Sequence, residues 1–128
     1  MRSAIGVLII GALITPAQVQ STGNELLSKC EAFLDSYHSL GPTTFQLRGD
    51  AADGFQCFGY VSAISAFAYL NLNGRRAIEH LCLPNGTTTV QLIRVLVNYG
   101  HQHPEILHGD AMLLALNSIS LAFPCDND

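Results

Sequence analysis

Four cysteines and five histidines are the residues of this 128-residue chain whose types and spacing say most about chemistry. No two cysteines are separated by only two residues, so neither a Cys-x-x-Cys redox motif nor a zinc-ribbon knuckle can form. In an oxidising compartment such cysteines pair as disulfides and supplement a small hydrophobic core. We therefore expect two disulfide bonds among Cys30, Cys57, Cys82 and Cys125.

Three of the histidines, His101, His103 and His108, occur close together in the sequence. A His-x-His pair followed by a third histidine can hold a transition metal. The spacing matches no common metal motif, however, and histidines near helix ends are frequent. We expect neither a metal site nor a cofactor, and a metal carrier that uses these three residues remains a third hypothesis for function.

Other patterns of catalytic chemistry are missing from the sequence. It contains no Gly-x-Ser-x-Gly elbow, and neither a paired-carboxylate site nor a glycine-rich phosphate loop can be recognised. The expectation is therefore a protein that is not an enzyme.

The N-terminus is typical of a secretory signal peptide over residues 1–17. Arg2 precedes an apolar run over 4–14, and small residues follow at 15–17. The run is about half the roughly 20 residues that a membrane-spanning helix needs, so we expect cleavage near Ala17 and no membrane span afterwards. The remaining residues, 18–128, are enough for a single domain. That domain has five basic and ten acidic residues, a net charge of −5, which makes nucleic acid a poor partner.

Hydrophobic residues recur at helical spacing through most of this domain, and glycine and proline divide the helices. The pattern predicts an all-α fold: a compact bundle of about four to five helices, stapled by two disulfides. We expect a loop over 39–56. The predicted helices are 24–38, an almost wholly apolar and therefore central buried helix 57–72, a short stretch 75–81, and the helices 88–101 and 104–122.

Two of these helices begin with a predicted capping box, in which two side chains satisfy free backbone donors of the first turn. Thr22 with Glu25 begins the first helix, and Thr88 with Gln91 begins the helix 88–101. Pro104 fits the first position of the final helix, because proline is favoured there.

The predicted helix lengths limit how the cysteines can pair. A helix over 57–72 would span roughly 24 Å, and the stretch 75–81 could return only about 10 Å, so Cys57 and Cys82 would lie too far apart. Two arrangements remain: Cys30–Cys57 with Cys82–Cys125, or Cys30–Cys82 with Cys57–Cys125. We prefer the first, which joins the first two predicted helices and ties the end of the chain to the central loop.

A series of short motifs, in a fixed order over roughly residues 25–125, resembles the bacterial family of resistance-associated and type VI amidase immunity (Rap/Tai) proteins. These motifs are Cys57-Phe58-Gly59-Tyr60-Val61, Cys82-Leu83-Pro84, Gln91-Leu92, Tyr99, His103-Pro104-Glu105, Leu107-His108 and Ala122-Phe123-Pro124-Cys125. The resemblance implies architectural roles for most of them. On this basis the cysteines form bridges, Gly59 permits close helix packing, and Pro84 and Pro104 make turns.

Members of that family are small, all-helical periplasmic proteins, often homodimers, that neutralise peptidoglycan amidase toxins delivered by type VI secretion. The resemblance therefore implies a periplasmic immunity protein that binds and inhibits an amidase effector toxin and forms a homodimer. The apolar faces Val90–Gly100 and Leu107–Ala122 are the candidate dimer contacts. Two polar turns are the candidate toxin-binding residues: Asn73, Gly74, Arg75 and Arg76, and Asn85, Gly86 and Thr87.

An alternative function is a periplasmic helical chaperone or stress protein with a broad range of clients. The modest core and five histidines, which gain charge as the pH falls toward about 6, are consistent with it. An immunity protein has one tight partner, whereas a chaperone has many weak ones.

Overall fold

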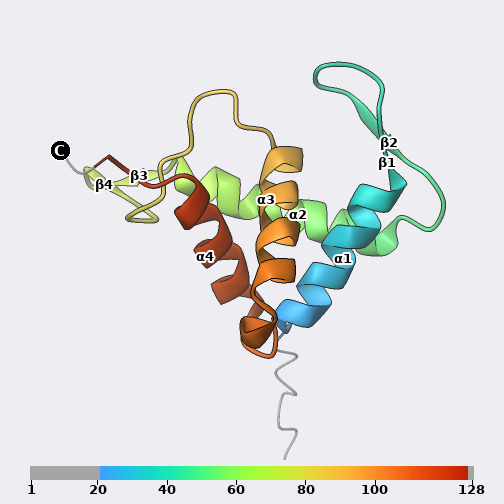
Figure 1. Cartoon of the computed structure of the whole chain (residues 1–128). Coiled ribbons are helices and arrows are strands. Elements are labelled where there is room, and N and C mark those ends of the chain that lie inside the picture. The colour runs from blue at the N-terminus through green and yellow to red at the C-terminus, as the bar shows by residue number, and fades with distance from the viewer. Residues whose placement is uncertain (1–20, 127–128) are drawn as a thin grey trace, which may run out of the picture.

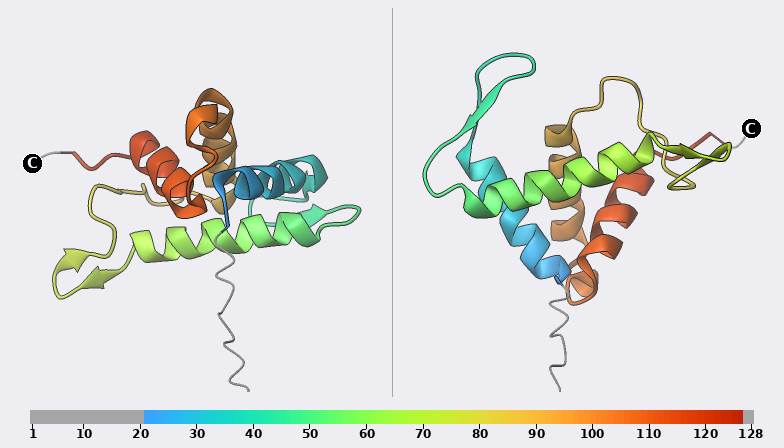
Figure 2. Two further views of the ribbon diagram at one scale, coloured as in Figure 1. Left: turned by 90° about the horizontal axis from the view of Figure 1, so that it is seen from below. Right: turned by 180° about the vertical axis from the view of Figure 1, so that it is seen from behind.

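The computed structural model describes residues 21–126, and the predicted signal peptide lies outside this part of the chain. Three helices, α1 (Gly23–Ser36), α3 (Thr89–Gln102) and α4 (Ala111–Ala122), form one layer (Figure 1). The longest helix of the described part, α2 (Ala52–Ala68), crosses one face of that layer (Figure 2). A short 3-10 helix, η1 (Pro104–Ile106), connects α3 to α4.

The predicted all-α fold is wrong, because residues 21–126 also contain two small antiparallel sheets. The first pairs β1 (Tyr37–Ser39) with β2 (Phe45–Leu47), and the second pairs β3 (Asn71–Leu72) with β4 (Arg75–Arg76). Each sheet is a hairpin that extends from one end of α2 (Figure 1). The fold is thus a helical core with two β-hairpin arms, a mixed α/β structure.

The first hairpin occupies part of the predicted loop 39–56. Tyr37 pairs with Leu47, and Ser39 pairs with Phe45. The rings of Tyr37 and Phe45 pack against Phe33 of α1, each with ring centres 5.6 Å apart. This packing holds the hairpin against the helical layer. The glycines and proline that indicated a loop lie in the turn and beyond β2, and α2 begins at Ala52, five residues before the predicted start.

The predicted helical stretch 75–81 is not helical: β4 of the second hairpin takes its first two residues, and bends and turns follow. Asn73 and Gly74 have φ angles of 53° and 80°, and a two-residue turn with both φ angles positive matches the twist of a hairpin. Asn-Gly is the dipeptide that this turn favours, so the local sequence selects a hairpin over a helix.

Both predicted capping boxes are present. Thr22 accepts a hydrogen bond from the backbone N–H of Glu25, whose carboxylate accepts one from the N–H of Thr22. Thr88 and Gln91 make the equivalent pair at the start of α3. These reciprocal bonds satisfy donors that the first turn of a helix leaves free.

The final helix begins later than predicted. Pro104 starts only the short η1, and α4 begins at Ala111. Asp110 caps α4, since its Oδ1 accepts a hydrogen bond of 2.7 Å from the N–H of Met112. An aspartate at this position is a stronger start signal for α4 than the distant proline.

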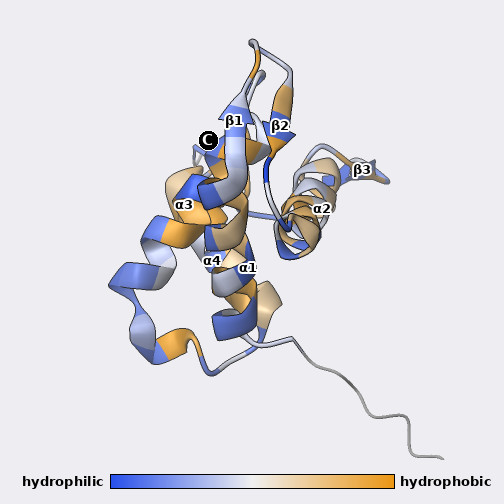
Figure 3. Ribbon diagram, turned by 90° about the vertical axis from the view of Figure 1, so that its right-hand side faces the viewer, coloured by the Kyte–Doolittle hydropathy of each residue, from blue (hydrophilic) through white to orange (hydrophobic). Residues whose placement is uncertain are grey.

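The core is a single cluster between the three-helix layer and the inner face of α2. Leu92, Ile93 and Leu96 of α3 are fully buried in it, so the Val90–Gly100 face proposed for dimer contact is largely core. Only one stripe of α2 is buried: Gly54, Cys57, Val61, Ile64 and Ala68. The predicted central buried helix is therefore buried along one stripe only. Most residues along α2 are hydrophobic or only weakly polar (Figure 3), and Phe55 and Phe67 among them are exposed.

Two glycines of α2 differ in their surroundings. A Cβ on Gly54 would lie 3.1 Å from the Cα of Phe33, so Gly54 permits the close crossing of α1 and α2. A Cβ on Gly59 would meet nothing within 4 Å. The expectation that Gly59 serves close helix packing is not met within one copy of the chain, although a mid-helix glycine costs about 0.5–1 kcal/mol relative to alanine.

Both preferred disulfides are confirmed. Cys30–Cys57 joins α1 to α2 with its Cα atoms 5.0 Å apart, and both cysteines are fully buried. Cys82–Cys125 has Cα atoms 4.9 Å apart and lies nearer the surface. A β-bridge between Leu81 and Pro124 runs beside it, which ties the end of α4 to the segment after β4.

Candidate partner-binding site

The structure brings the two predicted polar turns to the same end of the molecule. Tyr69 caps the C-terminus of α2, and its hydroxyl donates a hydrogen bond of 3.1 Å to the carbonyl oxygen of Pro84. That carbonyl also accepts from the N–H and the hydroxyl of Thr87, at 3.2 and 2.8 Å. Gly86 has a φ of 86°, which closes this second turn. One acceptor thus fixes the 84–87 turn and attaches it to α2.

A pocket of about 240 Å³ lies between the two turns. Arg76 and Asn85, one from each predicted turn, both line it. Its other lining residues are Ala68, Tyr69, Asn71 and Leu83. Asn73, Gly74 and Arg75 lie at the exposed tip of the β3–β4 hairpin and do not line the pocket. Gly86 and Thr87 form the rest of the second turn.

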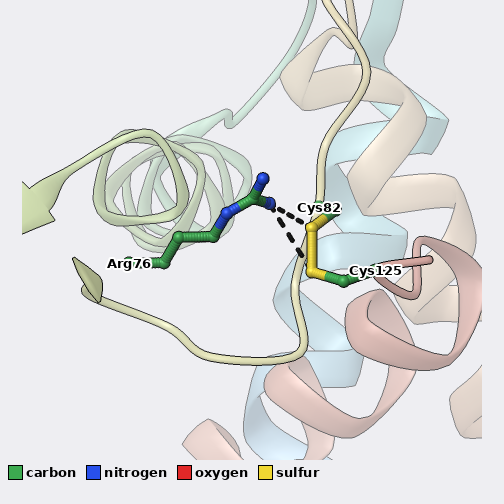
Figure 4. Close-up of a disulfide and its surroundings, with 3 residues drawn as sticks. All are labelled: Arg76, Cys82 and Cys125. Atoms are coloured by element: carbon green, nitrogen blue, oxygen red, sulfur yellow. Dashed lines mark hydrogen bonds between the residues drawn. A yellow bond between two sulfur atoms is a disulfide. The ribbon is translucent and has the colours of Figure 1, made fainter. Parts of the chain in front are cut away.

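Arg76, which is exposed, contacts the second disulfide. Its guanidinium donates to the sulfurs of Cys82 and Cys125 (Figure 4). The backbone N–H of Cys82 also donates to the carbonyl of Phe123, at 3.0 Å. The hairpin, the 84–87 turn and the end of the chain therefore form one connected surface, which we call the hairpin site: Tyr69, Asn71, Asn73–Arg76 and Asn85–Thr87.

A second, larger pocket of about 410 Å³ lies at the opposite hairpin, between the β1–β2 turn and the start of α3. Phe45 and Phe58 form its apolar wall, and Thr88 and Arg94 contribute polar groups from α3. Sequence reasoning missed this pocket, because its walls come from a hairpin that was predicted to be a loop.

The clustered histidines are not brought to one point. His101 Nε2 lies 2.7 Å from Glu31 Oε1 across α1 and α3, and His103 Nδ1 lies 3.0 Å from Glu105 Oε1. Throughout residues 21–126, no group of three His, Cys, Asp or Glu side chains is placed to hold a metal ion. The carboxyl of Glu105 accepts a hydrogen bond from its own backbone N–H and one from His103, and these hold its pKa below the usual range.

These features define a class: a small, disulfide-bonded protein with a helical core and exposed polar hairpin and turn surfaces. The chain matches the family model of Rap1a immunity proteins over residues 22–125, and it therefore belongs to that family. Comparison with curated proteins and with solved structures gives no match. Membership makes the chain a toxin immunity protein, whose partner is a protein toxin. Its disulfides suit an extracellular or periplasmic location.

None of the helices in the described range has the length and apolar content that crossing a membrane requires.

Proposed function

We propose that the protein is a periplasmic immunity protein that binds and inhibits a peptidoglycan amidase toxin delivered by type VI secretion. Support comes from the family match together with the convergence of both polar turns at the hairpin site. Inhibition is stoichiometric, and the chain performs no catalysis. Residues 1–17 direct export and are removed, and residues 18–128 act as a single domain.

The shape of the β3–β4 hairpin supports an inhibitor that inserts into a groove. Its tip consists of only two residues, Asn73 and Gly74, and the whole hairpin is exposed. It projects beyond the end of α2 (Figure 2). Such a narrow tip fits an active-site groove, where it blocks the Cys/His centre of an amidase. Because the tip is closed by a tight turn, little ordering is needed on binding.

The charges at the hairpin site add specificity. Arg75 is exposed beside the tip, and Arg76 is anchored against the disulfide. Arginine is enriched among the residues that dominate protein interfaces. In a chain whose formal net charge is −4, two adjacent arginines form a local positive region that suits an acidic rim on the toxin.

The test begins with capture of partners by the tagged, oxidised protein from the envelope of its native host, followed by mass spectrometry. Recovery of one Cys/His amidase near stoichiometry, whose hydrolysis of purified peptidoglycan the protein stops, supports the proposal. The proposal is contradicted if the protein inhibits none of the hydrolases that it captures. The N-terminal sequence of the periplasmic protein tests cleavage near Ala17.

Matched variants then test the location of the site. Arg75→Glu combined with Asn85→Arg alters the hairpin site, and Arg94→Glu alters the larger pocket. Arg48→Glu, which directly follows β2 but lines neither pocket, is the exposed control. We expect inhibition to be at least tenfold weaker for the Arg75→Glu/Asn85→Arg variant and unchanged for the other two. If Arg94→Glu abolishes inhibition and the Arg75→Glu/Asn85→Arg variant retains it, the binding site lies at the other hairpin.

The alternative function, a chaperone or stress protein, draws support from exposed apolar residues such as Phe55 and Phe67 of α2. The same capture experiment separates the two functions, because a chaperone retains many exported proteins at low stoichiometry. The homodimer implied by the resemblance is also part of this proposal.

A further inference from the structure

The pocket of about 410 Å³ beside the β1–β2 hairpin shares no lining residue with the hairpin site. Three elements enclose it: the β1–β2 hairpin with its 41–44 turn, the first turns of α3, and Phe58 of α2. Its volume falls in the range of small-ligand sites, roughly 300–1,000 Å³. The pocket therefore has the size of a binding site, and its lining indicates which chemistry it accepts.

The apolar part of the lining consists of three half-buried aromatic rings. Phe45 and Phe58 have ring centres 5.1 Å apart, and the ring of Tyr37 lies 5.6 Å from that of Phe45. Phe33, which is fully buried, contacts all three at 5.6 Å between ring centres. Because the rings pack on one another and on the core, this apolar wall is formed before a ligand arrives. It suits a ring or a branched aliphatic side chain.

The charge of the pocket is positive. Among the described residues that line it, Arg94 alone is charged, and Arg94 is exposed. The segments that supply the lining, 36–49, 54–74 and 80–104, contain no Asp or Glu, although the whole chain has ten.

The guanidinium of Arg94 forms no ion pair or hydrogen bond with the rest of residues 21–126. Its N–H groups are thus available to a ligand. A guanidinium binds a carboxylate through two parallel N–H donors, and one positive charge balances one carboxylate. A phosphate group carries nearly twice that charge at neutral pH, so a carboxylate is the better match.

Hydroxyl groups complete the lining. Thr43 and Thr44 contribute them from the hairpin turn, and Thr88 and Thr89 from the start of α3. Thr88 is engaged in its capping box, and Thr89 accepts from Ser62 at 3.3 Å. The hydroxyls of Thr43 and Thr44 form no hydrogen bond within the described part of the chain. A hydroxyl both donates and accepts, so it can pair with the N–H or the C=O of a peptide group.

We propose that this pocket binds the carboxyl-terminal residue of a peptide whose last side chain is apolar. The side chain lies on the aromatic wall, the terminal carboxylate on Arg94, and the preceding peptide group beside Thr43 and Thr44. Capture of a free chain end by fixed donors is a recurring mode of peptide recognition. The threonine hydroxyls favour a peptide over a simple apolar acid, which has no peptide group for them to bond.

This inference goes beyond the proposed function, and its test needs no toxin. The full chain is expressed with isotope labelling and purified in its oxidised form from the periplasm. It is then titrated, with NMR detection, with an acetylated tetrapeptide that ends in phenylalanine. We expect saturable shift changes confined to residues 41–45, 58 and 88–94.

Two further probes separate the contributions of the ligand. The same peptide with an amidated C-terminus should bind at least about tenfold more weakly, because it loses a charge-assisted hydrogen bond. The acid 3-phenylpropionate keeps the ring and the carboxylate but has no peptide group. It should also bind more weakly than the peptide acid.

Arg94→Gln tests the role of the guanidinium. Arg94 is exposed and has no partner among residues 21–126, so we expect the variant to fold normally. It should bind the peptide acid no better than the peptide amide, whereas a structural defect would weaken both alike. Arg48→Gln is the matched control, because Arg48 is an exposed cation that does not line the pocket. This control should keep the wild-type preference for the acid.

Several results would overturn the proposal. These are a lack of saturable binding by the peptide acid, equal affinity for acid and amide in the wild type, and a preference for the acid that persists in Arg94→Gln. Binding of 3-phenylpropionate as tight as that of the peptide would overturn the assignment to a peptide. Shift changes centred on the hairpin site would do the same for the assignment to this pocket.

Discussion

The Nη1 of Arg76 lies 3.5 Å from the sulfur of Cys125. The same nitrogen donates to the Cys82 sulfur, so a positive charge rests directly against one of the two disulfides (Figure 4). The other disulfide, Cys30–Cys57, is fully buried in the core. The two bonds therefore differ both in access to solvent and in local charge.

Selective reduction is the first expected consequence. A nearby cation stabilises the thiolate that leaves when a disulfide is attacked, and exposure gives a reductant access. Limited dithiothreitol should reduce Cys82–Cys125 well before Cys30–Cys57, as alkylation and peptide mass spectrometry will show. Arg76→Gln should slow the first reduction. Equal rates at the two bonds, or no effect of Arg76→Gln, would contradict this account.

We expect the disulfide that closes the shorter loop, Cys30–Cys57, to contribute more to stability than Cys82–Cys125. The chain-entropy model gives about 3.5 kcal/mol for the separation of 27 residues and about 4 kcal/mol for that of 43. Removal of the buried bond also leaves a cavity between α1 and α2. Cys30→Ala with Cys57→Ala should therefore cost more than Cys82→Ala with Cys125→Ala. Urea unfolding of the two double variants measures the order, and the reverse order would show that loop entropy dominates.

The two glycines of α2 should respond oppositely to alanine. Gly54→Ala forces a Cβ against the backbone of Phe33 and should destabilise the fold by about 1–3 kcal/mol. Gly59→Ala meets open space and should stabilise the monomer by about 0.5–1 kcal/mol. Denaturant titration at a concentration that favours monomer compares them. A loss of stability in both variants would mean that Gly59 has a packing role inside one copy.

The pKa of Glu105 should depend on His103. Hydrogen bonds from the backbone N–H of Glu105 and then from His103 lower the pKa of this carboxyl. A carboxyl with a lowered pKa stabilises the fold above the pKa of the unfolded chain, and this contribution is lost as the pH falls through the folded value. His103→Ala should raise the pKa of Glu105 without restoring it fully, because the backbone bond remains. A carbon-detected NMR titration measures the change, with His108→Ala as the control that should leave this pKa unaltered.

The sequence alone was enough to predict the features that depend on a local pattern of residues. Thr22 with Glu25 and Thr88 with Gln91 specify helix starts through their own side chains, and the limited reach of helices reduced the disulfide pairings to two. The hairpins were missed for two reasons. Asn73-Gly74 lies between the predicted helix 57–72 and the predicted stretch 75–81, where the same dipeptide is also a signal that ends a helix. The β1–β2 hairpin depends on aromatic packing with Phe33 of α1.

The exposure of α2 and the assembly of the hairpin site could not be predicted from the sequence for a different reason. Apolar composition predicted a buried helix, yet Phe55 and Phe67 face solvent, because composition cannot say which neighbours cover a helix. The two polar turns were chosen separately from their residues. That Arg76 and Asn85 line one pocket depends on the bond from Tyr69 to Pro84, which links segments far apart along the chain.

The two disulfides close covalent rings that follow one another along the chain and do not overlap, 30–57 and 82–125. A protease that cuts inside either ring, for example in the 40–44 turn or the 84–87 turn, leaves all of the polypeptide in one piece. A single cut at the Asn73-Gly74 tip falls between the rings and divides the protein into two separate chains. The exposed tip that we assign to toxin binding is thus also the point at which one proteolytic nick removes the covalent link between α1–α2 and α3–α4, so that only the shared core then holds the two chains together.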